Sequence, residues 1–174
     1  MNEALQNLLT RRSVRQYRDE MIPEDILDAI LEAGLYAPSG RNFQPVTMVA
    51  VRDRATRDLL SKMNAAVMGA DSDPFYGAPV VIVVLADRNL SHLGVEDGSL
   101  AMGNLMNAAH AVGVGSCYIF RAKEVFESPE GQALLAKWGV PETYIGVGNC
   151  ILGYPAEGGI RPVSPRKENY IIRV

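Results

Sequence analysis

The sequence predicts a single domain built from both helices and strands, and three observations lead to this fold class. The chain has 174 residues, 48% hydrophobic and 21% charged, which suits one globular domain but not two large ones. Apolar residues recur at helical spacing in some segments and form short β-branched runs in others. No repeat, low-complexity stretch or linker divides the chain. Residues 1–174 are therefore expected to fold as one unit.

The first half of the chain contains helix signals on either side of a strand signal. Glu3–Leu9 carries its leucines on one side, which predicts a short helix. In the next segment Pro23 and the two acidic residues after it suit a helix start, apolar residues recur at helical spacing, and Pro38 ends the pattern. Beyond it, the pattern predicts a strand at Thr47–Val51, a helix at Arg54–Val67 and an irregular connection at Met68–Gly77.

The second half begins with a run, Pro79–Leu85, that is uniformly apolar and β-branched, as expected for a strand buried on both faces. Glu96–Val112 predicts a helix that is apolar around most of its circumference, and so a central helix or a subunit interface. Further strands are expected at Gly115–Phe120 and Tyr144–Leu152, and a helix around Pro129 at Lys123–Trp138. The last segment, 156–174, has strand-forming residues without a neighbouring partner, so we expect it to pair with another subunit's sheet.

Charge and composition exclude several classes of protein. The 17 basic and 20 acidic residues give a net charge of −3, which argues against a nucleic-acid or membrane-binding protein. Cys117 and Cys150 are too few and too far apart for a disulfide scaffold or a zinc site. The longest apolar run is far shorter than a membrane span, and no secretory signal is visible. A cytoplasmic protein is expected.

One basic stretch, Arg11–Arg18, stands out in this acidic chain. It places four arginines and Ser13 within eight residues. Guanidinium and hydroxyl donors that converge in this way suit the oxygens of a phosphate group. The alternative is a solvated turn whose arginines pair with Asp19, Glu20 and Glu24. A nucleic-acid site is less well supported, because the stretch is short and lacks interleaved stacking aromatics.

A second candidate is the loop Pro38–Pro45, which prolines bracket at both ends. Ser39, Asn42 and Gln44 offer groups that both donate and accept hydrogen bonds, as the edge of a flat heterocycle requires. The alternative is a turn in which these side chains bond to the loop's own backbone.

Other chemistries find little support. Gly113–Tyr118 lacks the third glycine of a dinucleotide fingerprint and follows a helix instead of a strand, so its glycines indicate close backbone approach. His92 and His110 have no metal-ligand spacing, and no metal site is expected. Cys117 lies in an apolar strand and is expected to be an inert core thiol. What remains fits an enzyme whose bound cofactor supplies the reactivity.

The basic stretch and the loop together resemble the two signature segments of the FMN-dependent nitroreductase family. The order of the later parts is also similar: a buried helix, Gly-Val-Gly-Ser-Cys and a basic C-terminal segment, so the resemblance covers essentially the whole chain. It implies an α+β fold with a central, mostly antiparallel sheet flanked by helices. It also implies an intertwined homodimer with exchanged C-terminal arms and two FMN sites at the subunit interface.

The resemblance also implies roles for individual residues. The FMN phosphate would be held by Arg11, Arg12 and Ser13, and the clamp completed by Arg166 and Lys167. Arg15 would approach the N1/O2 edge of the flavin, and Asn64 its pyrimidine edge. The other subunit would contact the ring or ribityl chain through Pro38, Ser39, Gly40, Asn42 and Gln44. Partly through backbone groups, the strand beside the ring would supply Cys117, Tyr118, Ile119 and Phe120.

The activity implied is hydride transfer from NADH or NADPH to the flavin and then to an electron-poor small molecule such as a nitroaromatic or quinone. The alternatives are a non-catalytic FMN-binding or sensing protein and an oxygen-using flavin enzyme of the same superfamily. Two departures concern the substrate pocket: Val46 follows the loop where many members have an aromatic residue, and the region between Val67 and Pro79 is short. The sequence does not choose between NADH and NADPH.

Overall fold

The computed structural model describes residues 1–174. Its six helices are α1 (Glu3–Thr10), α2 (Glu24–Leu35), α3 (Arg54–Met68), α4 (Gly94–Ala111), α5 (Ala122–Glu127) and α6 (Pro129–Lys137). Its four strands are β1 (Val46–Val51), β2 (Val80–Asp87), β3 (Gly115–Ile119) and β4 (Tyr144–Gly153). The predicted loop 38–45 contains one short 3₁₀ turn, Gly40–Asn42.

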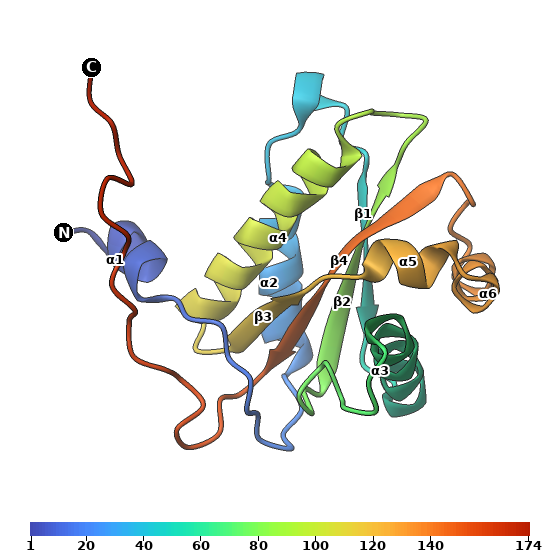
Figure 1. Ribbon diagram of the computed structural model, residues 1–174, viewed down its shortest axis with the longest axis horizontal. Helices are drawn as coiled ribbons and strands as arrows, with labels where there is room; N and C mark the ends of the chain where they lie inside the picture. The colour runs from blue at the N-terminus through green and yellow to red at the C-terminus, as the bar shows by residue number, and fades with distance from the viewer.

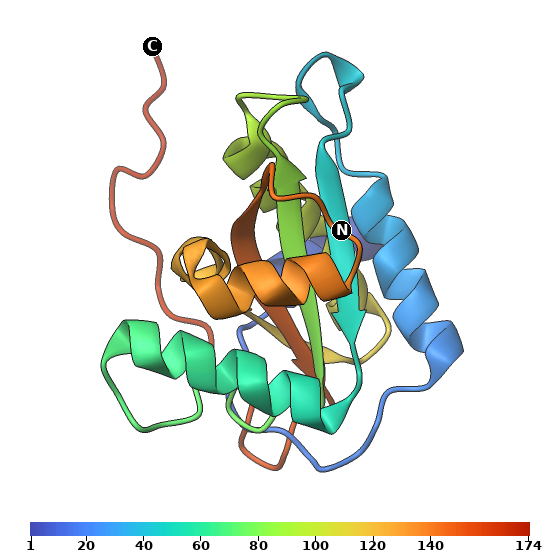
Figure 2. The same cartoon turned by 90° about the vertical axis from the view of Figure 1, so that its right-hand side faces the viewer.

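The strands form one sheet in the order β1-β2-β4-β3, and each neighbouring pair is antiparallel. Helices cover both faces: α2 and α4 lie on one side of the sheet, and α3, α5 and α6 on the other (Figures 1 and 2). The fold is therefore α+β with an antiparallel sheet flanked by helices. This confirms the fold class that the family resemblance implied.

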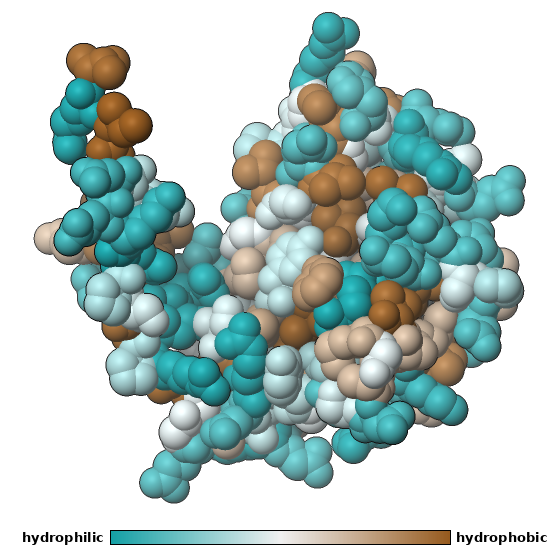
Figure 3. All heavy atoms as spheres, in the orientation of Figure 1, coloured by the Kyte–Doolittle hydropathy of each residue, from teal (hydrophilic) through white to brown (hydrophobic).

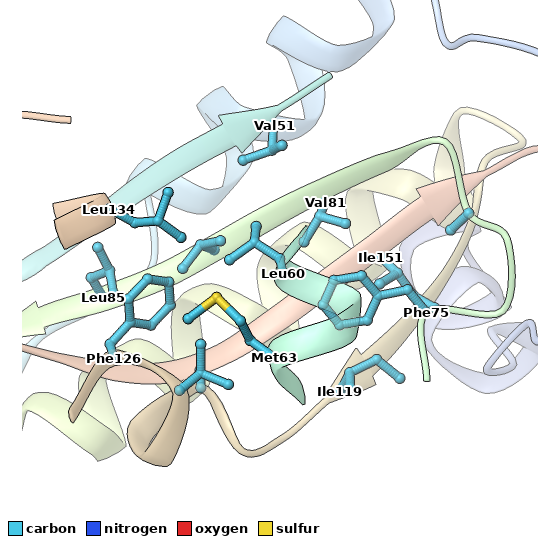
Figure 4. Packing of buried hydrophobic residues seen from close by; sticks show 14 of the residues in the cluster. Val51, Leu60, Met63, Phe75, Val81, Leu85, Ile119, Phe126, Leu134 and Ile151 are labelled. Atoms are coloured by element: carbon cyan, nitrogen blue, oxygen red, sulfur yellow. The ribbon is translucent and has the colours of Figure 1, made fainter. Parts of the chain in front are cut away.

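The central strand β2 explains why its sequence is uniformly apolar. Val81, Val83 and Leu85 point into the cluster that includes α3 and α5, while Ile82 and Val84 point into the cluster with α2 and α4. Figure 4 shows side chains of α3 and α5 packed against the strands in the first cluster. A strand covered by helices on both faces has no solvent side, as its sequence predicted.

Two expected helices differ from the structure. The helix expected around Pro129 is two helices, because proline has no N–H for a helix interior and instead begins α6 after the N-cap Ser128. Helix α4 is buried along the face toward the sheet, but in one chain Val95 and Leu100 on its other side are half exposed. Of the two expectations for α4, this exposed face favours an interface.

Gly146 in β4 lets the start of α5 pack closely against the strand. A Cβ atom at this position would lie 2.3 Å from the Ala122 carbonyl oxygen, at the start of α5. Backbone cannot move aside as a side chain can, so Gly146→Ala should destabilise the fold by about 3 kcal/mol. Denaturant unfolding of the variant measures this loss. An unchanged midpoint would show that α5 does not pack on β4 as described.

The C-terminal residues 156–174 form no helix or strand and project away from the body (Figures 1 and 2). The outer half of this arm stands clear of the body, with apolar atoms near its end (Figure 3). Its exposed apolar side chains are Ile160, Val163, Tyr170, Ile171, Ile172 and Val174. The Ala156 amide donates to the Gln16 carbonyl at 3.0 Å and Gly159 is buried, but every residue from 160 onward is exposed, so the expected pairing with a second subunit stays a prediction. None of the helices combines the length and apolarity needed to cross a bilayer.

Candidate flavin site

The basic segment covers the outer edge of β3. The Val14 amide donates to the Ser116 carbonyl at 2.9 Å, and Ser13 and Ser116 form a parallel bridge. The buried Val14 side chain and the Tyr17 hydroxyl, which donates to the Val14 carbonyl at 2.7 Å, secure this part of the segment. A free sheet edge is thereby closed, and the arginines are placed beside the strand predicted to run along the flavin.

Some guanidinium nitrogens of Arg11 and Arg12 lack acceptors, although Nη1 of Arg12 donates to the Leu9 carbonyl at 2.9 Å. Nη1 of Arg11, and Nε and Nη2 of Arg12, are buried without a hydrogen-bond partner. Neither residue forms an ion pair, nor does Arg15, whereas Arg18 pairs with Glu20 at 2.9 Å. A buried charged donor without an acceptor is costly, so an anionic group with several oxygens fits this place. The alternative of a solvated turn with paired arginines is therefore correct for Arg18, but not for Arg11, Arg12 or Arg15.

His110 joins the end of α4 to the end of α1 beside these arginines. The Thr10 hydroxyl donates to the Gln6 carbonyl at 2.8 Å and so accepts from Nε2 of His110, also at 2.8 Å. His110 and Arg12 line the same pocket of about 170 Å³. Burial, with the nearby charges of Arg11 and Arg12, lowers the pKa of His110 below its ordinary value. The same charges that favour a phosphate therefore disfavour a proton on this ring.

This lowered pKa makes stability depend on pH. Below the ordinary histidine pKa of about 6.5 the unfolded chain binds more protons than the folded one, so stability should fall as the pH drops from 7.5 to 5.5. The loss is expected to be small, a few degrees at most in Tm. His110→Gln should remove most of it, whereas exchange of the exposed His92 should not. Equal pH dependence in wild type and His110→Gln would contradict the assignment.

Arg15 is exposed, and its guanidinium carbon lies 5.9 Å from the centre of the Tyr76 ring. Tyr76 belongs to the irregular connection after α3, which Asp73 ties down by accepting from Arg57, Ser61 and the Gly77 amide. Burial alone would raise the pKa of Asp73, but these hydrogen bonds lower it. The short connection is thus anchored to α3, and it places the Tyr76 ring beside Arg15.

Asn64 is fully buried and joins α3 to the turn after β3. Its Nδ2 donates to the Phe120 carbonyl at 2.9 Å, and its Oδ1 accepts from Nε of Arg121 at 2.9 Å. The guanidinium of Arg121 in turn lies 4.1 Å from the centre of the exposed Phe120 ring. Arg121 was not predicted as a partner of Asn64, because nothing in its local sequence distinguishes it from other arginines. The predicted contact of Asn64 with the flavin stays a prediction.

The β3 side chains alternate between the two faces of the sheet. Cys117 and Ile119 are buried in the cluster with α3 and α5, as expected of a core thiol. Tyr118 faces the other cluster, and its hydroxyl donates to the Val147 carbonyl at 2.8 Å. A ligand beside this strand would therefore meet mostly backbone groups and the exposed Phe120.

The loop 38–45 is shaped by its own hydrogen bonds. The Ser39 hydroxyl accepts from the Gln44 amide at 2.9 Å, and Nε2 of Gln44 donates to Oδ1 of Asn42 at 3.0 Å. Arg41, Asn42 and Gln44 all have positive φ angles of 50–58°, which non-glycine residues seldom adopt. The alternative of a self-bonded turn is thus correct for the free chain. Pro38, Ser39 and Gln44 also line a pocket of about 300 Å³ against α4.

The two candidate regions lie at opposite ends of α4. The loop contacts α4 through Asp97 in its first turn, and Thr10, which directly precedes the basic segment, contacts it through His110 in its last. Thirteen residues of helix span about 20 Å. Arg166 and Lys167 lie on the exposed arm and contact neither region. One chain therefore places Ser13 beside Ser116 in β3 and Asn64 beside Phe120 just after it, while the loop contacts the other end of α4 and the end of the arm is exposed.

Comparison with known proteins decides the family. The model of the nitroreductase family matches residues 8–154, a span that contains both candidate regions and all four strands. The chain belongs to the nitroreductase family. The resemblance seen in the two signature segments is thereby confirmed. Among curated relatives, an Archaeoglobus fulgidus protein named as an NADH dehydrogenase/NAD(P)H nitroreductase is 36% identical over 90% of this chain and 88% of its own. A Bacillus subtilis FMN reductase [NAD(P)H] is 26% identical over 90% of this chain and 68% of its own.

Solved nitroreductases have the same fold. A Bacteroides fragilis nitroreductase with bound FMN matches with a TM-score of 0.91 and 32% identity over the whole of both chains. A Desulfitobacterium hafniense nitroreductase, also with bound FMN, has a TM-score of 0.88 and 25% identity, over 100% of this chain and 99% of its own. The likeness extends over the full length, so the short connection after α3 does not alter the nitroreductase fold.

Proposed function

We propose that this nitroreductase-family protein is an FMN-dependent oxidoreductase that uses NADH or NADPH to reduce an electron-poor small molecule such as a nitroaromatic or quinone. The observation that carries the proposal is the set of buried Arg11 and Arg12 donors without acceptors, in the segment where the family signature lies. A phosphate would supply the missing oxygens. The FMN bound in two similar structures carries such a phosphate.

In this proposal each residue has a binding or electrostatic role. Arg11, Arg12 and Ser13 hold the phosphate, while Arg15 places a positive charge at the N1/O2 edge, where reduction concentrates negative charge. FMN held by these residues would supply the hydride chemistry between the nicotinamide and the acceptor. No group of three or more His, Cys, Asp or Glu side chains is placed to hold a metal ion.

We also propose that two copies build each site, because one chain holds its two candidate regions about 20 Å apart. Exposed apolar residues support a second copy: those of α1, the end of α2 and the arm face no partner in one chain. A surface of this kind is typical of an interface. The loop 38–45 would then complete the site that the partner's basic segment begins.

Removal of the arm tests this assembly. A chain ending at Ile160 loses only residues that are exposed in the single chain, so its fold should persist. Without Val163 and the Tyr170–Ile172 apolar group, the dimer should weaken at least 100-fold. Sedimentation velocity over a concentration series measures this, with FMN affinity followed in parallel. A truncated protein that stays dimeric and binds FMN normally would contradict arm exchange.

The activity is tested by mixing the FMN-loaded protein with NADH or NADPH under nitrogen in a stopped-flow instrument. Rapid bleaching of the flavin, followed by recovery of its colour on addition of a quinone or nitroaromatic, is the expected result. No bleaching with either nucleotide would indicate a passive FMN-binding protein. Recovery of colour with oxygen but with no organic acceptor would indicate an oxygen-using flavin enzyme.

A further inference from the structure

Asp97 is a buried carboxylate that the function described so far does not use. It is 3% exposed, in the first turn of α4. Its Oδ1 accepts from the Gly40 amide at 2.9 Å, while its Oδ2 is buried with no partner. No cationic side chain pairs with it, so its charge is balanced by a loop amide and by the helix N-terminus. A carboxylate kept in this position at such a cost calls for an explanation.

The contacts of the loop 38–45 explain why a carboxylate is buried here. Of the hydrogen bonds made by residues 38–44, those of Ser39, Asn42 and Gln44 stay inside the loop, and only the Gly40 amide bonds outside it, to Asp97. Gly40 also sits so close to α4 that a Cβ atom would lie 2.7 Å from the Leu93 side chain. Backbone strain of three positive φ angles persists only where the surroundings hold it. The loop is thus braced by its own hydrogen bonds. Its middle is joined to the body at Gly40, and its end at Pro45, whose carbonyl accepts from the Asp87 amide at 2.9 Å.

We propose that Asp97 is a positioning residue that aims the loop 38–45 at the flavin ring through its hydrogen bond to Gly40. This inference rests on the proposed function, in which the loop contacts the ring or ribityl chain of the FMN. In this proposal Asp97 acts through Gly40, whose amide donates to it at 2.9 Å. Because the loop is proposed to meet the ring or ribityl chain while the basic segment of the other copy holds the phosphate, loss of Asp97 should affect the ring side of the ligand and not the phosphate side.

The test compares FMN with riboflavin, which has the ring but no phosphate. Dissociation constants for both are measured by flavin fluorescence in wild type, Asp97→Ala, Asp97→Asn and Glu96→Ala. Asp97→Ala should weaken both ligands by the same factor, about tenfold. Asp97→Asn keeps an acceptor for the Gly40 amide and should stay within about threefold of wild type. Glu96 is the exposed acidic neighbour on the same helix turn, and its exchange should change neither constant.

A spectroscopic readout accompanies the affinities. The visible circular dichroism of bound FMN should change in Asp97→Ala and be restored in Asp97→Asn, since it reports how the ring is held. If Asp97→Ala does not fold, Asp97→Ser takes its place, because its shorter side chain withdraws the acceptor from the Gly40 amide and should also weaken both ligands.

Three results would overturn the inference. Asp97→Ala could bind both ligands as wild type does, Asp97→Asn could be as impaired as Asp97→Ala, or only FMN could be weakened. If wild type binds neither FMN nor riboflavin, the proposed function fails and this inference fails with it. Wild-type binding with unaffected Asp97 variants would overturn the role of Asp97 alone.

Discussion

Arg12→Ala should weaken FMN binding by at least 100-fold, to the point where the purified protein loses its flavin on dilution. Two of the three guanidinium nitrogens of Arg12 are buried without acceptors, and hydrogen bonds to charged groups contribute about 1.5–3 kcal/mol each. Two such bonds to a phosphate therefore correspond to a factor of 10² or more. Arg11→Ala, with one such nitrogen, should loosen FMN less.

Riboflavin and Arg18 provide the controls for this prediction. Riboflavin has no phosphate, so its affinity should be the same in wild type and Arg12→Ala. Arg18 lies in the same segment but already pairs with Glu20, so Arg18→Ala should bind FMN normally. Isothermal titration with both ligands measures these affinities. A variant that loses riboflavin and FMN equally would show that Arg12 supports the fold or the ring, not the phosphate.

Arg15→Ala should leave FMN bound but lower its reduction potential by about 40–80 mV. The positive charge of Arg15 favours the reduced flavin, and preorganised donors of this kind contribute about 2–4 kcal/mol. For a two-electron couple, 30 mV corresponds to about 1.4 kcal/mol. The Arg15 guanidinium is free to act in this way, because it forms no ion pair and only lies near the Tyr76 ring.

The potential is measured by equilibrating the protein with a reference dye during enzymatic reduction. Arg15→Lys keeps the charge and should recover most of the lost potential, which separates a charge effect from a packing effect. An unchanged potential in Arg15→Ala would contradict the placement of this residue at N1/O2. Loss of FMN in the same variant would instead assign it to the phosphate group.

Much of the fold could be predicted from local sequence because the decisive signals are local. The β-branched run of β2 and the helical spacing of α2 and α3 are properties of consecutive residues, and the observed boundaries lie within one or two positions of those expected. The helix around Pro129 was wrong in detail because proline also begins helices, and Ser128 before it provides an N-cap. The antiparallel order came from the family resemblance and not from periodicity.

The candidate site was less predictable, because its geometry depends on contacts between distant residues. Asn64 meets Arg121, and Asp97 meets Gly40, across 57 residues in each case. No spacing in the sequence reveals such pairs. The basic segment was recognisable because its four arginines lie within eight residues, but only the structure separates Arg11, Arg12 and Arg15, which form no ion pair, from Arg18, which pairs with Glu20.

The central claim is that the basic segment holds the phosphate of FMN, and thermal unfolding with and without added FMN tests it most directly. A ligand at about 1,000 times its Kd stabilises the folded state by about 4 kcal/mol, which raises the Tm of a chain this size by about 10 °C. We predict a rise of this order with FMN, a smaller one with riboflavin, and a yellow purified protein. A colourless protein whose Tm does not move with FMN would contradict the account.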